Sequence, residues 1–132
     1  MTDQIATATL VDNIFIELTF LRENITLGVN EVADGWAKAQ KLSPDKKYAV
    51  LLKTGRLTLL EKEARDYVLN ELKIWPFVAI VVDNLGQRIM GQVIINMTGK
   101  GSHIKIFEKE AKAKEWLLGK VYENKFAPNA QV

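Results

Sequence analysis

Cysteine is absent from the 132 residues, and histidine occurs only once. The chain therefore forms no disulfide, offers no thiolate to a metal ion and has no cysteine nucleophile. A single histidine also disfavours a transition-metal site, so we expect no metal. That histidine, His103, begins a predicted strand directly after Ser102. Because adjacent side chains on a strand point to opposite faces, the two are poorly placed as a nucleophile and its base, and we expect a surface histidine.

Long hydrophobic runs are also missing. The longest strongly apolar runs, such as Val78 to Val82, are far shorter than the roughly 20 residues that cross a bilayer. Residues 1–5 lack the basic segment and the continuous apolar core of a signal peptide. We therefore expect a cytoplasmic protein without stable membrane insertion.

Neither sign of charge predominates, since 18 basic and 16 acidic residues give a net charge of +2. Most basic residues stand beside acidic ones in predicted helices, as in Glu108 to Glu110 and Lys112 to Glu115. Such mixing is typical of a solvated helix face and not of a phosphate-binding stripe, so we expect no nucleic-acid partner. Length and composition predict a single domain over residues 1–125 and a flexible tail over residues 126–132.

Apolar periodicity predicts an alternation of strands and helices. The predicted strands are residues 5–11, 14–20, a short piece within 24–29, 48–52, 77–82 and 103–107. The predicted helices are residues 31–42, 60–73, 85–97 and 108–123. This order indicates an α/β domain with an N-terminal β-hairpin, a mixed sheet with a parallel β-α-β portion and about four helices.

Local signals sharpen the first of these elements. Asp12 and Asn13 tolerate positive φ and suit the tight turn of the hairpin. The strand after this turn alternates apolar and polar residues, which predicts one buried face. Asn30 is the expected N-cap of the first helix. The inner face of that helix is predicted to carry Val32, Trp36 and Ala39.

Several segments together resemble a known family. They are Glu63-Ala64-Arg65-Asp66-Tyr67, Val78 to Gly86, Gly91 within an apolar helix, and Lys105-Ile106-Phe107 before Ala111 to Leu117. Their order and spacing over about residues 8–120 resemble the STAS-like (SpoIIAA-like) proteins of unknown function common in Bacteroidetes-type bacteria. The order of elements is similar to that of the STAS domains, the fold of the bacterial anti-sigma-factor antagonists. The resemblance implies a small cytoplasmic protein that works by binding, without cofactor or metal.

The resemblance also bears on phosphorylation. In the phosphorylated STAS antagonists, a serine follows the central strand at the start of the next helix and is switched by a partner kinase. The matching stretch, Lys53 to Glu63, contains no serine, and Lys53 stands where that strand usually ends in an acidic residue. Thr54 and Thr58 are its only hydroxyl groups, and neither falls on the expected position. This departure argues against regulation by that route.

Polar residues at strand ends form the first candidate site. Open α/β sheets bind ligands at the carboxyl ends of their parallel strands. Lys53, Thr54 and Thr58 follow one predicted strand, and Asp83 and Asn84 follow the next. These five residues are a possible polar crevice. A solvated loop and simple helix capping are the more ordinary explanations of the same residues.

An apolar surplus forms the second candidate site. The helix over 85–97 is more apolar than one buried stripe requires, which leaves Met90, Ile94 or Ile95 for a second face. Trp75 precedes a proline, where a partly exposed ring could contact a partner. We therefore expect a non-enzymatic interaction module that forms a homodimer. The alternative is a small apolar or lipid-like ligand between this helix and the sheet, and an enzyme is the least favoured hypothesis.

Overall fold

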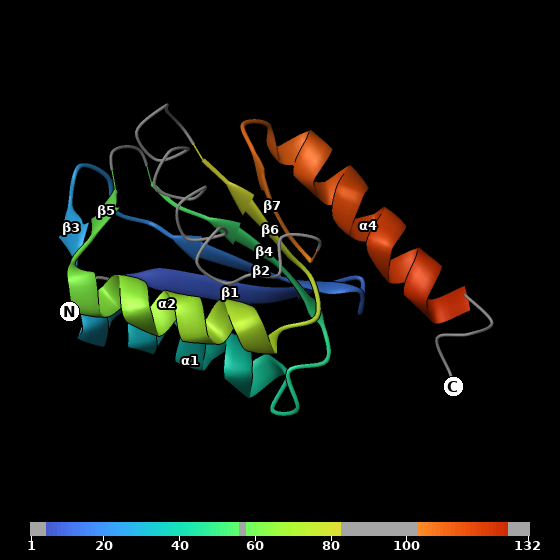
Figure 1. The fold of residues 1–132 in the computed structure, drawn as a ribbon, viewed down its shortest axis with the longest axis horizontal. Helices are drawn as coiled ribbons and strands as arrows, with labels where there is room; N and C mark the ends of the chain where they lie inside the picture. Colours follow the sequence, from blue (N-terminus) through green and yellow to red (C-terminus); the bar gives the residue numbers. More distant parts are fainter. Residues whose placement is uncertain (1–4, 56–57, 83–102, 127–132) are drawn as a thin grey trace.

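The computed structural model describes residues 5–55, 58–82 and 103–126 (Figure 1). The strands are β1 (Ala6–Val11), β2 (Phe15–Phe20), β3 (Thr26–Leu27), β4 (Ala49–Lys53), β5 (Leu59–Leu60), β6 (Val78–Val81) and β7 (Ile104–Phe107). The helices are α1 (Val29–Leu42), α2 (Lys62–Ile74) and α4 (Glu110–Phe126). The predicted helix over 85–97 lies outside the described residues. So does the predicted tail beyond Phe126, which itself belongs to α4.

Five strands form one sheet in the order β1-β2-β4-β6-β7. β1 runs antiparallel to β2, whereas the pairs β2–β4, β4–β6 and β6–β7 are parallel. The predicted mixed sheet, with a hairpin at one side and a parallel portion, is therefore confirmed. A second sheet pairs the two-residue strands β3 and β5 in parallel, and this pairing was not predicted. Leu60, the first residue of the predicted helix 60–73, lies in β5 instead.

The hairpin turn forms where the sequence predicts it. Asp12 and Asn13 have φ angles of 52° and 55°, the left-handed region that short polar side chains tolerate. The Ile14 N–H donates to the Val11 carbonyl at 2.8 Å and closes the turn.

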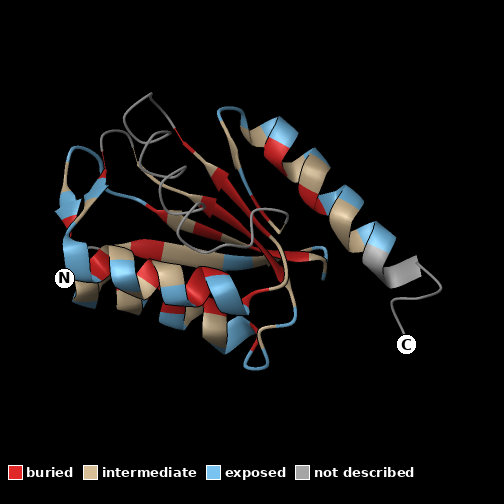
Figure 2. Cartoon of the chain, in the orientation of Figure 1, coloured by how far each residue is buried: buried red, intermediate tan, exposed pale blue. Residues whose placement is uncertain are grey.

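Helices cover both faces of the sheet, α1 and α2 on one side and α4 on the other (Figure 1). Ile16 and Leu18 of β2 are buried beneath α1 and α2. Phe15 points to the opposite face, yet it is only 3% exposed because it packs with Ala113 and Leu117 of α4. The prediction that this strand has one buried face is therefore wrong at Phe15. Figure 2 shows the resulting band of buried residues along the central strands.

The first helix begins earlier than predicted. Its N-cap is Gly28 and not Asn30, which lies inside the first turn. The Gly28 N–H donates to Glu31 Oε1 at 2.8 Å, so the carboxylate satisfies a backbone donor at the positive end of the helix. The predicted inner face is confirmed, since Val32, Trp36 and Ala39 are all fully buried.

Candidate functional site

The predicted polar crevice is divided between different parts of the fold. Asp83 and Asn84 lie outside the described residues. Thr58 is 6% exposed, and its hydroxyl donates to the Arg22 carbonyl at 3.0 Å. This bond fastens the segment before β5 to the segment after β2, a structural role that the sequence pattern does not reveal. Thr54 is half-buried directly after β4.

Lys53, the last residue of β4, belongs to a cluster of four charged side chains on the α4 side of the sheet. Its ammonium lies 3.1 Å from Glu17 Oε2 of β2 and 3.2 Å from Glu110 Oε1 of α4. Lys114, one turn further along α4, lies 2.8 Å from Glu110 Oε2 and 3.9 Å from Glu17 Oε1. The cluster therefore joins two strands to the first turn of the helix that covers them.

The charges of this cluster perturb the pKa values of Lys53 and Glu110. Partial burial by itself lowers the pKa of Lys53, but hydrogen bonds and charges from Glu17 and Glu110 outweigh burial and raise it. The hydrogen bond from Lys114 is the main cause that lowers the pKa of Glu110, and Lys53 adds to it against partial desolvation. Lys53 is thus held as an ammonium ion and Glu110 as a carboxylate. Such a lysine supplies a positive charge but no lone pair for nucleophilic or base chemistry at neutral pH.

Of the predicted interaction surface, Met90, Ile94 and Ile95 lie outside the described residues, and Trp75 is buried. The expectation of a partly exposed Trp75 ring is wrong, because the side chain is 1% exposed and packs 6.1 Å from the Trp36 ring, centroid to centroid. Its indole N–H donates to Glu71 Oε1 at 3.2 Å. Glu71, itself 6% exposed, supplies the acceptor that a buried indole requires.

Glu71 is a buried carboxylate that the sequence pattern did not single out. Its Oε1 also accepts a hydrogen bond from Gln40 of α1 at 2.9 Å, and Lys46 lies 3.4 Å from its Oε2. Buried carboxylates persist in folded proteins when donors of this kind surround them. The arrangement ties α1 to α2 and indicates a structural role.

His103 lies at the amino end of β7 and is half-buried, so it faces solvent less than expected. Its Nε2 is 2.8 Å from the carbonyl oxygen of Leu72 in the last turn of α2. The contact joins the helix end to the neighbouring strand. No group of three or more acidic, histidine or cysteine side chains within the described residues is arranged to hold a metal ion.

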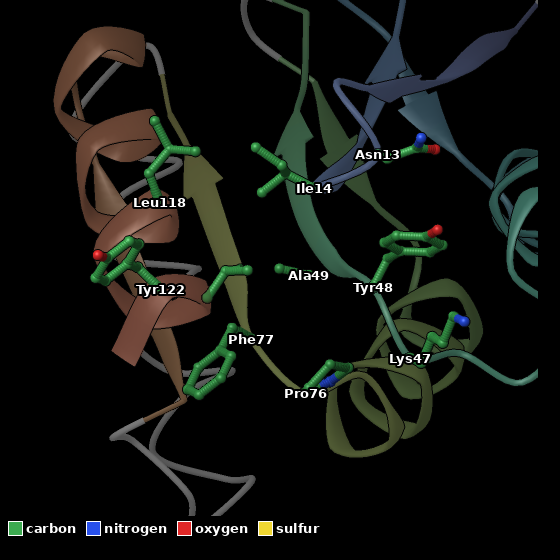
Figure 3. A pocket seen from close by; sticks show the side chains of 10 residues that line it. Asn13, Ile14, Lys47, Tyr48, Ala49, Pro76, Phe77, Leu118 and Tyr122 are labelled. Atoms are coloured by element: carbon green, nitrogen blue, oxygen red, sulfur yellow. The ribbon is translucent and has the colours of Figure 1, made fainter. Parts of the chain in front are cut away.

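An apolar pocket opens at the other end of the sheet, beside the amino ends of β4 and β6 (Figure 3). Its volume is about 660 Å³. Figure 3 shows Leu118 and Tyr122 of α4 on one side of the opening and Ile14 and Tyr48 across from them. The lining is completed by Asn13, Lys47, Ala49, Pro76, Phe77 and Val121.

The pocket exposes large side chains to solvent. Leu118 is 43% and Tyr122 66% exposed. A single exposed side chain is ordinary, but these two border the same pocket, and a continuous apolar surface is a feature of binding sites. The two stand four positions apart, on one face of α4. Polar side chains also line the pocket, among them Asn13 and Lys47. The Lys47 ammonium lies 5.6 Å from the Tyr48 ring centroid.

This pocket was not predicted from the sequence. Apolar spacing over 108–123 predicts an inner face with Ala113, Trp116, Leu117, Val121 and the methylene stem of Lys120. The structure confirms this face for the fully buried Ala113 and Leu117. The sequence did contain a sign of the pocket. Leu118 and Tyr122 are spaced four positions apart on the helix, and they lie outside that inner face. None of the helices in the described part of the chain is both long and apolar enough to cross a membrane.

Comparison with known proteins identifies the fold and the family. The chain is similar to a crystal structure of an uncharacterised DUF3478 family protein with a SpoIIAA-like fold from Shewanella loihica PV-4, with a TM-score of 0.59 and 19% sequence identity. The match covers 89% of this chain and 98% of that chain. At this identity the likeness shows the fold alone, and it confirms the predicted SpoIIAA-like architecture. No curated protein matches the chain. The model of a domain of unknown function, DUF7793, matches residues 8–120, so the chain belongs to this family.

Proposed function

We propose that this protein is a non-enzymatic, dimeric interaction module of the cytoplasm, and that a protein partner docks on the pocket between α4 and the sheet. The observation that carries the proposal is the exposure of Leu118 and Tyr122 at the rim of a pocket whose lining is mainly apolar. Exposed apolar surface with aromatic side chains is a feature of protein-binding sites. A partner that covers these side chains removes apolar area from water, which favours association.

The charged cluster argues against catalysis by Lys53. Of the described members of the predicted crevice, only Lys53 has an ionisable side chain. Its ammonium is engaged by Glu17 and Glu110, and its raised pKa keeps the proton in place. A lysine that acts as a general base or a nucleophile needs a lowered pKa. Lys53 therefore serves better as a cross-link between the sheet and α4.

A quantitative pull-down from the native cell tests the proposed surface. The bait proteins are the wild type and the variant Leu118→Glu/Tyr122→Glu, which adds charge to the pocket rim. Leu59→Glu is the matched control, because Leu59 is an exposed leucine, at 50%, on β5 and away from α4. We expect one partner to be retained by the wild type and by Leu59→Glu and lost by the double variant. Equal recovery on all three baits would refute docking at this pocket.

A small apolar or lipid-like ligand is the second candidate function, and the pocket favours it too. Ligand pockets commonly have volumes of about 300–1,000 Å³ with a mainly apolar lining, and this pocket falls in that range. The ligand would lie beside α4, whereas the sequence-based prediction was a site between helix 85–97 and the sheet. Mass spectrometry of organic extracts from purified protein tests the idea. A ligand-binding protein yields a copurified apolar molecule that Leu118→Glu depletes, and extracts without any such molecule contradict it.

A further inference from the structure

β1 forms one edge of the five-stranded sheet in the described part of the chain, and it is an unusual edge strand. Its six residues, Ala6–Val11, include no charged residue, glycine or proline. Edge strands normally carry such residues because an open strand edge pairs readily with another strand. The opposite edge follows this rule, since β7 has four residues and an exposed lysine, Lys105, at its second position.

The hydrogen bonds of the hairpin reveal which backbone groups of β1 face outward. The Leu21 N–H donates to the Ile5 carbonyl at 2.8 Å. Hydrogen-bonded and non-hydrogen-bonded pairs alternate along an antiparallel ladder. The odd-numbered residues of β1 therefore bond to β2, and Ala6, Ala8 and Leu10 direct their N–H and C=O groups away from β2. Ala8 and Leu10 are half-buried at this edge, whereas Ala6 is fully buried. The position of Lys38 supports this outward direction for the Ala6 carbonyl, because the Lys38 ammonium donates to that carbonyl at 2.6 Å from outside the sheet.

We propose that β1 is the surface through which two copies of this chain associate, by antiparallel pairing about a two-fold axis at Ala8. This inference rests on the proposed function, of which it specifies the dimer. In this register Ala8 pairs with the same residue of the second copy, and Ala6 pairs with Leu10. The outward N–H and C=O groups of Ala8 then meet in a hydrogen-bonded pair. The two pairs between Ala6 and Leu10 form when the Lys38 side chain moves away from the buried Ala6 carbonyl.

The side chains of β1 are complementary to themselves in this register. On the face towards α1, the small Ala6 lies opposite the larger Leu10 of the second copy, so both fit without overlap. On the other face Thr7 lies opposite Thr9, and threonine pairs across antiparallel strands are favourable. No like charges meet because β1 has none. This self-complementarity favours a second copy over an unrelated peptide as the occupant.

Lys38 moderates the association. It already satisfies one outward carbonyl, that of Ala6, in the single chain. A carbonyl oxygen has two lone pairs and accepts a second donor, but the ammonium occupies space at the edge. We therefore expect a reversible dimer and not an open-ended assembly, since β7 does not offer a matching edge.

Cysteine cross-linking tests the register directly, because the chain has no cysteine of its own. Thr7→Cys and Thr9→Cys proteins are prepared separately and oxidised with a glutathione buffer, alone and as a mixture. In the proposed register residue 7 of one copy faces residue 9 of the other in a non-hydrogen-bonded pair, with Cα atoms about 4.5 Å apart. That separation is within the range of a disulfide. We expect the mixture to cross-link at least several-fold faster than either protein alone. Equal rates in all three samples, or no cross-link, would overturn the register.

Sedimentation velocity separates this inference from the proposed function. The wild type is compared with Ala8→Pro, which removes an outward N–H without touching the bonds to β2, and circular dichroism confirms that the variant is folded. We expect the wild type to dimerise as its concentration rises and Ala8→Pro to remain monomeric. A dimer that persists in folded Ala8→Pro overturns the β1 surface but leaves a dimeric module intact. A wild type that is monomeric at every concentration overturns the dimer itself, while the pull-down on α4 remains the test of partner binding.

Discussion

Two glycines in helices are expected to respond to alanine with opposite signs. Gly35 lies inside α1, and a methyl group there would come within 2.6 Å of the Phe20 ring and 3.1 Å of Ala6 Cβ. Gly119 lies inside α4, and a methyl group there meets nothing within 4 Å. Both substitutions relieve the same intrinsic cost, because glycine in a helix is less favourable than alanine by about 1 kcal/mol. The surroundings therefore decide the difference between them.

Steric overlap outweighs helix propensity at Gly35. The Phe20 ring is 4% exposed and held in the core beneath α1, so it cannot move away freely. Overpacking of a buried site costs about 1–3 kcal/mol. After the gain in propensity, we expect Gly35→Ala to lower the free energy of unfolding by up to about 2 kcal/mol. Gly119→Ala should raise it by about 0.5–1 kcal/mol.

Urea unfolding followed by circular dichroism measures both variants. A second background, Phe20→Leu, removes the ring that Gly35 accommodates, so Gly35→Ala should cost less there than in the wild type. Such a coupling is expected between residues in direct contact. Two results would refute the reasoning: a Gly35→Ala protein as stabilised as Gly119→Ala, or an unchanged cost in the Phe20→Leu background.

The two buried tryptophans and the charged cluster give further predictions. Trp75→Phe should destabilise the protein by about 1.5–3 kcal/mol more than Trp36→Phe, because the Trp75 N–H bonds to Glu71 and hydrogen bonds to charged groups are of this size. The Trp36 N–H has no hydrogen-bond partner among the described residues. Equal losses of stability for the two variants in thermal unfolding would contradict the role given to the hydrogen bond between Trp75 and Glu71. Glu110→Gln should cost less than about 1 kcal/mol at neutral pH, since the pair with Lys53 is partly exposed. The lowered pKa of Glu110 makes its contribution present above its ordinary value of 4.5 and lost as pH falls through the folded value. The difference in the free energy of unfolding between Glu110→Gln and the wild type should therefore disappear in acid. A difference that stays constant with pH would contradict a stabilising role for the Glu110 carboxylate.

Local signals were strong enough to predict most of the fold. Asp12 and Asn13 specify the hairpin turn through their tolerance of positive φ, and the apolar spacing of Val32, Trp36 and Ala39 specifies the buried face of α1. The pairing of β3 with β5 escaped prediction because two-residue strands have no measurable periodicity. The N-cap moved to Gly28 because the Glu31 carboxylate can reach its N–H.

The candidate sites were harder to predict because they depend on contacts between distant segments. Trp75 follows a helix and precedes a proline, and nothing in that local sequence reveals that Glu71 and Trp36 enclose it. A lysine at a strand end, such as Lys53, is compatible with an anion-binding site. In the structure Glu110 of α4 pairs with Lys53 instead, so that Lys53 links the sheet to α4. The spacing of residues along the sequence identifies which side chains share one face of a helix or strand. It does not identify which distant segments pack against that face.

The two ends of the sheet therefore have different capacities for binding. Ligands of parallel sheets usually bind at the carboxyl ends of the strands. In the described part of this chain, the carboxylates of Glu17 and Glu110 are balanced there by the ammonium groups of Lys53 and Lys114. The amino ends of β4 and β6 open instead on the pocket beside α4. Pairing through β1 occurs at the sheet edge away from the strands that α4 covers, so it would leave both pockets of the dimer open. A dimer with two open pockets binds a bivalent partner more tightly than either pocket alone, because the second contact becomes intramolecular. If both proposals hold, disrupting β1 pairing with Ala8→Pro should weaken partner retention in the pull-down without changing the pocket.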